Sequence, residues 1–66
     1  MEIKDILISE RKKRGMTQQQ LAEHLHMARG SYALYETGKN TPTTENILRL
    51  AELYQTSTDY LLGRYK

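Results

Sequence analysis

Apolar residues along the chain recur at intervals of three and four, the spacing of one helix face, and strand-like alternation is absent. This pattern predicts five short helices joined by tight turns. Their expected ranges are about 2–14, from 18 to 24 or 25, 29–37, from 44 to about 54, and 58–62. The sequence therefore predicts an all-α fold, a compact bundle of five short helices.

Residues that favour helix ends mark the boundaries of these segments. Thr17, with Gln20 three residues later, predicts a capping box at the start of the second helix. A glycine favours the left-handed conformation that closes a helix, and small hydroxyl side chains favour the N-cap. The other boundaries are marked in this way by Gly15, Gly38, Thr43, Ser57 and Gly63.

The apolar face of each segment supplies the candidate core. In the second and third segments it consists of Leu21, Ala22, Leu25, Tyr32 and Tyr35. In the fourth it consists of Ile47, Leu48, Leu50, Ala51 and Tyr54. The two remaining tyrosines after position 54, Tyr60 and Tyr65, are expected to be exposed or to lie at a dimer interface.

Length and composition exclude several classes of protein for this chain. A chain of 66 residues has room for one small domain, here 1–66. The absence of cysteine excludes disulfides, a thiolate nucleophile and Cys-ligated zinc. No apolar run reaches the length of a membrane span, and no signal-peptide pattern opens the chain. A cytoplasmic protein with no membrane partner is expected.

The net charge of +2 conceals an uneven distribution of basic residues. Residues 1–40 hold seven basic and five acidic side chains, and four of the basic ones form the run 11–14. Such a run indicates a polyanion as partner, or only the solvated end of a helix. Both interpretations stay open for Lys12, Lys13 and Arg14.

The segment 17–37 carries the most specific pattern: a capped short helix, a tight turn, and a second short helix. In the second helix Tyr32 and Tyr35 form an apolar face. The other side is small or polar, with Arg29, Gly30, Ser31, Ala33 and Leu34. A helix that packs on its own domain while sliding past base edges in the major groove of DNA needs this division.

Several strings extend the pattern over nearly the whole chain. They are R-x-x-x-G-M-T-Q-x-x-L-A at 11–22, Y-E-x-G at 35–38, T-P-T at 41–43, L-A-x-x-Y at 50–54 and S-T-D-Y-L-L-G at 57–63. With these strings in this order, the chain resembles the Cro/cI-type helix-turn-helix domains (XRE family) of phage and prophage repressors. The resemblance implies a lambda-repressor-like DNA-binding fold and a sequence-specific transcriptional regulator, most often a repressor.

The resemblance implies roles residue by residue. Base contacts are expected from Gln18, Arg29, Gly30, Ser31, Ala33 and Leu34, and backbone contacts from Thr17, Thr37, Lys39 and Asn40. Gln18 matches a position that touches a phosphate and often an outer base. Arg29 is the expected reader of guanine, because its guanidinium bonds O6 and N7 together. Leu34 is expected to contact a thymine methyl group or, alternatively, to belong to the core.

The resemblance also implies how the protein is held together and with what it associates. Arg11 and Glu36 are expected to form a structural ion pair. Double-stranded DNA with a two-fold symmetric operator is the expected partner, bound by a homodimer formed through Thr56, Thr58, Tyr60 and Leu61. Two alternatives are a protein-interaction or antitoxin-like module on the same fold, and a DNA-binding module of a larger repressor.

Three residues depart from the family pattern. His26 occupies a turn position where the family usually has a glycine with positive φ, and Ala28 replaces the usual hydroxyl residue at the N-cap of the recognition helix. Gly30 replaces a side chain that often contacts bases. We therefore expect modest sequence discrimination per subunit, with phosphate contacts carrying much of the affinity.

Other chemistry finds little support in the sequence. His24 and His26 lie two apart with no obvious third ligand, whereas a zinc site needs three or four donors. No phosphate-binding glycine loop, metalloprotease histidine pair, or nucleophile beside a plausible base occurs. We expect no enzymatic activity, no metal or other cofactor, and no small-molecule ligand.

Overall fold

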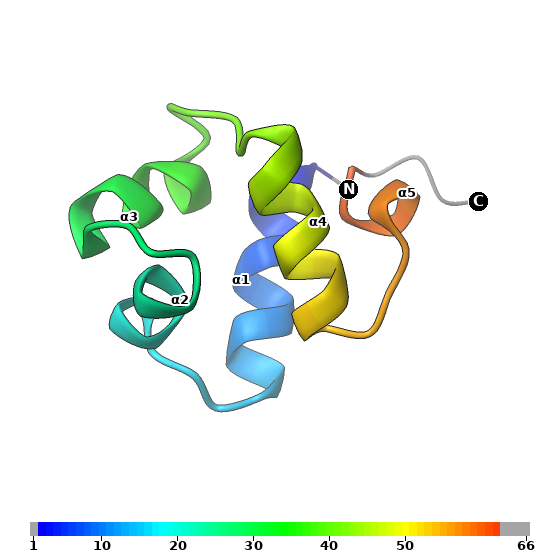
Figure 1. Ribbon diagram of the computed structural model, residues 1–66, viewed down its shortest axis with the longest axis horizontal. Helices are drawn as coiled ribbons and strands as arrows, with labels where there is room; N and C mark the ends of the chain where they lie inside the picture. The colour runs from blue at the N-terminus through cyan, green and yellow to red at the C-terminus, as the bar shows by residue number, and fades with distance from the viewer. Residues whose placement is uncertain (1, 63–66) are drawn as a thin grey trace.

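The computed structural model describes residues 2–62, whose regular elements are all α-helices (Figure 1). The helices are α1 (Ile3–Lys13), α2 (Gln18–His24), α3 (Arg29–Thr37), α4 (Thr44–Leu53) and α5 (Thr58–Leu61). The predicted all-α bundle of five short helices is confirmed. Gly63 and Tyr65, named above as a boundary and an exposed or interface residue, lie outside the described residues. None of the helices in the described range combines the length and apolarity required to cross a membrane.

The predicted helix caps form. The Thr17 hydroxyl accepts a hydrogen bond from the Gln20 amide at 3.1 Å, and the Gln20 side chain accepts one from the Thr17 amide at 2.8 Å. Thr43 and Ser57 cap α4 and α5 in the same manner. Glycines take the left-handed conformation after α1 and at the end of α3: Gly15 at φ 66° and Gly38 at φ 83°.

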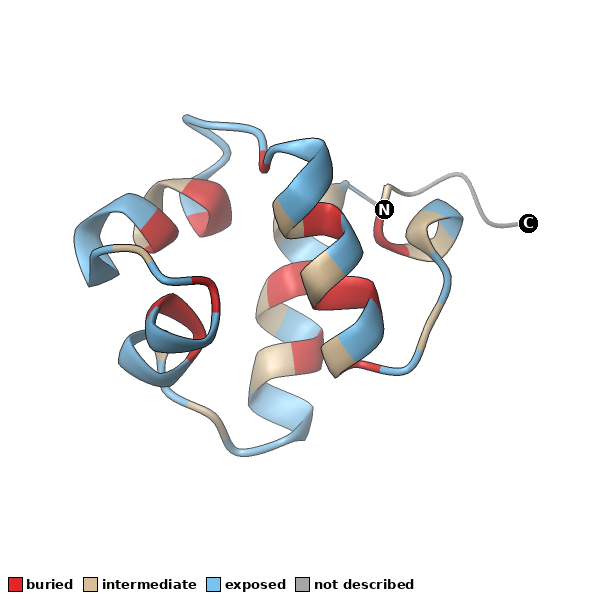
Figure 2. Cartoon of the chain, in the orientation of Figure 1, coloured by how far each residue is buried: buried red, intermediate tan, exposed pale blue. Residues whose placement is uncertain are grey.

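The core draws side chains from every helix, and α1 lies between the two halves that the other helices form (Figure 1). α3 packs against α2 and α1, whereas α5 packs against α4 and α1. The buried faces of all five helices turn inward (Figure 2). The largest side chains that are fully buried are Leu7, Leu21, Tyr32, Leu50, Tyr54 and Leu61.

A buried carboxylate that the sequence analysis did not single out holds the second half in place. Glu10 is 4% exposed and accepts hydrogen bonds from Lys13 at 3.1 Å, from Arg14 and from the Tyr60 hydroxyl at 2.9 Å. Arg14 also donates to the Tyr54 carbonyl at 2.8 Å and stands 4.7 Å above the Tyr54 ring. Arg14 therefore ties α1 to the end of α4 and is not simply a solvated helix end.

The structure corrects the expected apolar face of α4. Leu48 is 56% exposed, whereas Ile47, Leu50, Ala51 and Tyr54 are buried. The four buried residues follow the spacing i, i+3, i+4, i+7 and share one face. Leu48 lies one residue beyond Ile47, about 100° further around the helix, and turns away from the core.

Two residues with side chains adopt the left-handed conformation that favours glycine. His26 has φ 57°, which confirms the positive φ expected in the turn between α2 and α3. Gln55 has φ 52° just after α4, at a position where no positive φ was predicted. Both conformations carry a steric cost for a residue with a Cβ.

Replacing His26 with glycine is expected to raise the melting temperature. The left-handed conformation costs a residue with a Cβ roughly 1–2 kcal/mol, and the greater backbone entropy of unfolded glycine offsets part of this gain. A net gain of about 1 kcal/mol corresponds to roughly 4–8 °C in a domain of this size. Thermal unfolding followed by circular dichroism measures the change.

The matched control is Gln19→Gly, which places a glycine at an exposed position inside α2. This control is expected to lower the melting temperature, since glycine within a helix costs about 1 kcal/mol. An unchanged or lower melting temperature for His26→Gly would contradict the strain assigned to the turn.

Candidate nucleic-acid interface

The helix-turn-helix unit is α2, α3 and the four residues between them. The turn is tightened by a hydrogen bond from the Met27 amide to the Ala22 carbonyl at 2.9 Å. Ala28 stands at the N-cap of α3 and gives no side-chain hydrogen bond, as its lack of a hydroxyl predicted. The start of α3 is thus open to solvent on the side away from the core.

The face of α3 opposite the core carries small side chains. Gly30, Ala33, Leu34 and Thr37 follow the spacing i, i+3, i+4, i+7 and share this face. A Cβ at Gly30 would meet no atom within 4 Å. Leu34 is half-buried but belongs neither to the core cluster nor to the apolar residues packed against it, which places it on the outer face.

The inner side of α3 ends in a buried carboxylate with four hydrogen bonds. Glu36 is 7% exposed and accepts from Arg11 Nε at 2.8 Å and Arg11 Nη2 at 3.1 Å. It also accepts from the Tyr32 hydroxyl at 2.6 Å and from Gln18 Nε2 at 3.1 Å. Burial by itself raises the pKa of Glu36, but these donors outweigh it and hold the pKa below its ordinary value. Arg11 and Glu36 therefore form the ion pair that the resemblance implied.

Gln18 extends this network to the surface of α3. A carboxylate only accepts hydrogen bonds, so the amide nitrogen of Gln18 faces Glu36 and its oxygen faces outward. That oxygen accepts a long hydrogen bond from Arg29 Nη1 at 3.4 Å. The exposed Arg29 guanidinium is thereby linked through one side chain to the buried ion pair.

A second hydrogen bond positions α3 from the side of α4. Asn46 Nδ2 donates to the Tyr35 hydroxyl at 2.9 Å. The Tyr35 ring meets the Tyr32 ring edge to face, with centroids 5.9 Å apart and planes at 76°. These contacts limit rotation of α3 about its own axis, which would change the side chains that it presents outward.

The four expected backbone-contacting residues, Thr17, Thr37, Lys39 and Asn40, are all exposed. The Thr37 hydroxyl donates to the Leu34 carbonyl at 3.1 Å and accepts from the Lys39 amide at 3.4 Å. The backbone amide of Asn40 also donates to the Leu34 carbonyl, at 3.2 Å. The loop after α3 is thus folded back onto the helix, which keeps Lys39 and Asn40 beside its end.

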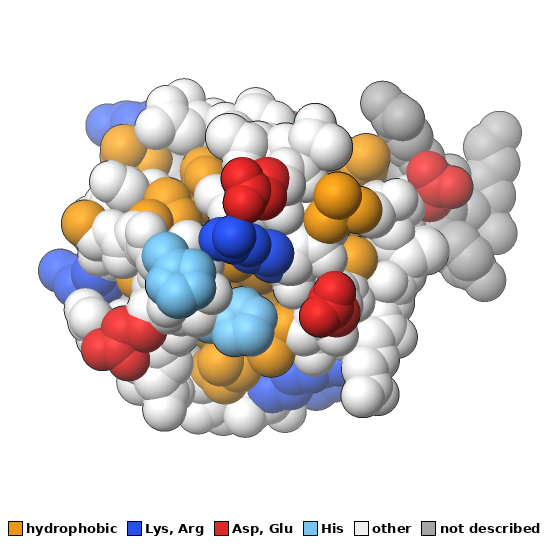
Figure 3. Space-filling view, viewed as in Figure 1, with side chains coloured by type: hydrophobic (Ala, Val, Ile, Leu, Met, Phe, Trp, Pro, Cys, Tyr) orange, Lys and Arg blue, Asp and Glu red, His pale blue; other side chains and the backbone are white. Residues whose placement is uncertain are grey.

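The two histidines, His24 and His26, are exposed and lie close together on one face beside a basic side chain (Figure 3). A basic neighbour repels a cation and supplies no ligand. Among residues 2–62, no three His, Cys, Asp or Glu side chains gather where they could hold a metal ion.

Comparisons with known proteins agree with this geometry. A family model described as helix-turn-helix matches residues 7–61. The cryptic phage CTXphi transcriptional repressor RstR of Vibrio cholerae is 38% identical over 98% of this chain and 58% of its own length. The HTH-type transcriptional regulator ImmR of Bacillus subtilis is 43% identical over 82% of this chain and 42% of its own. The chain therefore spans about half the length of these curated relatives.

A solved structure shares the same arrangement of helices. The crystal structure of the P22 c2 repressor protein in complex with a synthetic operator superimposes with a TM-score of 0.89 at 26% identity, over 98% of each chain. The crystal structure of a transcriptional regulator from Listeria innocua gives a TM-score of 0.93 at 29% identity, over 98% of this chain and 61% of the other.

Removing the Glu36 carboxylate is expected to destabilise the protein strongly. Glu36→Ala leaves the Arg11 guanidinium, 15% exposed, without its counter-charge, and breaking a buried pair in this way costs about 3–5 kcal/mol. Urea unfolding at neutral pH measures the loss. Because the folded protein holds the pKa of Glu36 below its ordinary 4.5, this stability is present at neutral pH and is lost as the pH falls below that value.

Glu45→Ala is the matched control, because Glu45 pairs with Arg49 at 2.8 Å but is 71% exposed. An exposed pair of this kind contributes at most about 1 kcal/mol. Equal losses for the two variants would contradict the structural role of Glu36. The Glu36 variant, where it folds, is also expected to lose less of its stability in acid than the wild type.

Proposed function

This chain belongs to the helix-turn-helix family, and we propose that it is a sequence-specific DNA-binding regulator of transcription that inserts α3 into the major groove. The observation that carries the proposal is the pairing of a small-residue outer face on α3 with an arginine held at its start. Gly30 and Ala33 let the helix backbone approach the bases closely, while Arg29 is linked by a long hydrogen bond to Gln18, which in turn donates to Glu36. A major groove about 12 Å wide admits such a helix.

Direct reading of bases falls mainly to Arg29. Only one of its donors is used by Gln18, so the guanidinium keeps donors for O6 and N7 of a guanine. Leu34 and Ala33 offer methyl groups to thymine, and Ser31 offers a hydroxyl to a base or a phosphate. The Gln18 side chain donates to Glu36 and accepts from Arg29, so it orients the arginine. The second hydrogen on Gln18 Nε2 is proposed to bond a phosphate oxygen.

Contacts with the sugar-phosphate backbone fall to Thr17, Thr37, Lys39 and Asn40. All are exposed, and the folded loop after α3 holds the last three beside the end of the helix. Such contacts carry affinity and orientation but no sequence information. Arg29 is the one long side chain in each subunit that is proposed to contact bases. This protein is therefore proposed to depend on backbone contacts more than a repressor whose recognition helix carries several base-contacting side chains.

The regulator is proposed to act as a repressor on a two-fold symmetric operator, bound as a homodimer. The names of the relatives support repression: RstR and the P22 c2 protein are both described as repressors, and the latter is in complex with an operator. Recognition helices of such dimers sit about 34 Å apart, one turn of DNA. A regulator of this kind works in the cytoplasm, where bacterial DNA lies.

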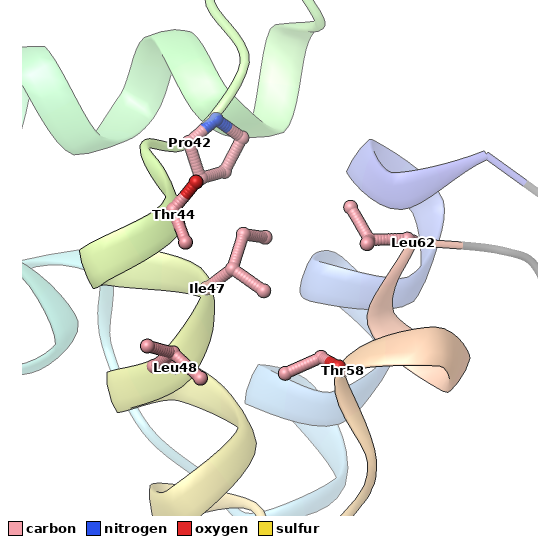
Figure 4. Close-up of a pocket in the computed structure, with 6 residues that line it drawn as sticks. All are labelled: Pro42, Thr44, Ile47, Leu48, Thr58 and Leu62. Atoms are coloured by element: carbon pink, nitrogen blue, oxygen red, sulfur yellow. The ribbon is translucent and has the colours of Figure 1, made fainter.

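We propose a dimer contact that differs from the one the resemblance implied. Leu61, one of the four expected at the interface, is fully buried in the core, and the Tyr60 hydroxyl is bonded to Glu10. Thr58 instead lines a groove between α4 and α5 (Figure 4). The other residues that line the groove are Pro42, Thr44, Ile47, Leu48 and Leu62. Leu48 is the exposed large hydrophobic residue of this surface, and we place the dimer contact there.

Selection from random duplexes tests the proposed function. The protein is mixed with a pool of random 30-base-pair duplexes at two salt concentrations, and the retained DNA is sequenced. A near-palindromic consensus with affinity that falls steeply as salt rises supports a dimeric regulator. Retention without a consensus would contradict sequence specificity. No retention at low salt would favour a protein-interaction module on the same fold.

Arg29→Ala is expected to weaken binding to the selected duplex by about 1–3 kcal/mol and to relax the preference for guanine at one position of each half-site. Arg49→Ala removes the same charge from α4, where Arg49 pairs with Glu45, and is expected to leave the consensus unchanged. Fluorescence anisotropy with the consensus duplex and with single-base variants measures both effects. A guanine preference that survives in Arg29→Ala would refute the assigned reading role.

Leu48→Glu is expected to abolish dimer formation on DNA while leaving the fold intact, because Leu48 is exposed and the core does not include it. Binding to a duplex with two half-sites should change from one cooperative step to two independent steps in a gel-shift titration. Ser9→Glu adds the same charge at an exposed position of α1 and controls for repulsion from DNA. Cooperative binding by Leu48→Glu would rule out the α4–α5 groove as the dimer contact.

A further inference from the structure

Lys4, in the first turn of α1, lies across the end of α3. Its Cδ is 3.0 Å and its Nζ 3.8 Å from the position that a Cβ at Gly38 would occupy. Gly38 ends α3 with φ 83°, so both its conformation and the space above it favour glycine. The stem of Lys4 therefore fills the place of a missing side chain, and its ammonium group stands beside the last turn of α3.

The ammonium group of Lys4 has no carboxylate partner among residues 2–62. The ion pairs of that range are those of Arg11, Lys13, Arg14 and Arg49. A cation at the C-terminus of a helix interacts favourably with the helix dipole, which explains the position of the group. This interaction with the dipole leaves the three N–H donors of the ammonium free for an external acceptor.

The neighbours of Gly38 identify that acceptor. Thr37 and Lys39 flank it directly and Asn40 follows, and these are the residues to which the proposed function assigns the DNA backbone. Lys4 comes to the same edge from a different helix, more than thirty positions earlier in the chain. We propose that Lys4 extends the backbone contact onto α1, with its ammonium donating to a phosphate oxygen of the strand that runs past the end of α3.

The packing of Lys4 suits this role. A lysine is normally a flexible point charge, and fixing it on DNA costs side-chain entropy. Here the stem already lies against Gly38, and the residue as a whole is half-buried before DNA binds. Lys4 is not on the outer face of α3, so it contributes affinity without reading bases.

The test compares Lys4→Gln with the wild type on the selected duplex, over a series of salt concentrations. A lost phosphate contact lowers the slope of log affinity against log salt by about 0.9. The ratio of wild-type to variant affinity is therefore expected to be about threefold larger at 50 mM than at 200 mM salt. The sequence consensus should not change, and Lys4→Arg should restore the wild-type slope.

Arg49→Gln removes the same charge from α4 and is expected to keep the wild-type slope. Thermal unfolding of Lys4→Gln reports its structural effect on α3 separately. Weaker binding with an unchanged slope would mean that Lys4 only supports the end of α3, and would overturn the proposal. The inference rests on the proposed function, so a wild-type protein that binds no duplex would overturn both. If the wild type binds and Lys4→Gln keeps the wild-type slope, only the Lys4 contact is overturned.

Discussion

The buried carboxylate of Glu36 is the group on which the placement of α3 depends. An ionised group taken out of water is tolerated only when it is fully paired and hydrogen-bonded. Glu36 meets this requirement with donors from three helices: Arg11 on α1, Gln18 on α2 and Tyr32 on α3. Since each donor must reach the same carboxylate, these hydrogen bonds restrict how α2 and α3 can be placed against α1. Arg29 is linked to this arrangement by its long hydrogen bond to Gln18.

Glu10 plays the corresponding part where α1 meets α5 and the end of α4. It binds Arg14 from its own helix and Tyr60 from α5, and Arg14 reaches the end of α4. Burial raises the pKa of Glu10, yet its donors bring the pKa below the ordinary value, as in Glu36. A small core with little apolar area is thus supplemented by two paired carboxylates, Glu36 in the α2–α3 half and Glu10 in the α4–α5 half. Both parts of the fold depend on ionised acids and weaken together in acid.

The proposed mode of binding follows from the sparse chemistry of α3. A helix with glycine, alanine and leucine toward the bases fits closely but discriminates weakly, so a single arginine carries most of the direct readout. In this proposal, affinity depends on the backbone contacts around the end of α3, including Lys4. Specificity depends on reading two half-sites at a fixed spacing, which makes the α4–α5 surface as important for recognition as the helix in the groove.

Features whose interaction partners lie within a few residues could be predicted from the amino-acid sequence alone. The capping box of Thr17 and Gln20 and the tyrosine face of α3 are governed by local hydrogen bonds and helical spacing, and each was predicted. Resemblance to a family added the Arg11–Glu36 pair and the positive φ of His26. Helix packing, in contrast, set which carboxylate Tyr60 binds, 50 positions away, and which way the Gln18 amide points. It also decided that Leu48 faces solvent, that Leu61 is buried, and that Lys4 covers Gly38. These features depend on the rotation and approach of packed helices, which the periodicity of one segment does not specify.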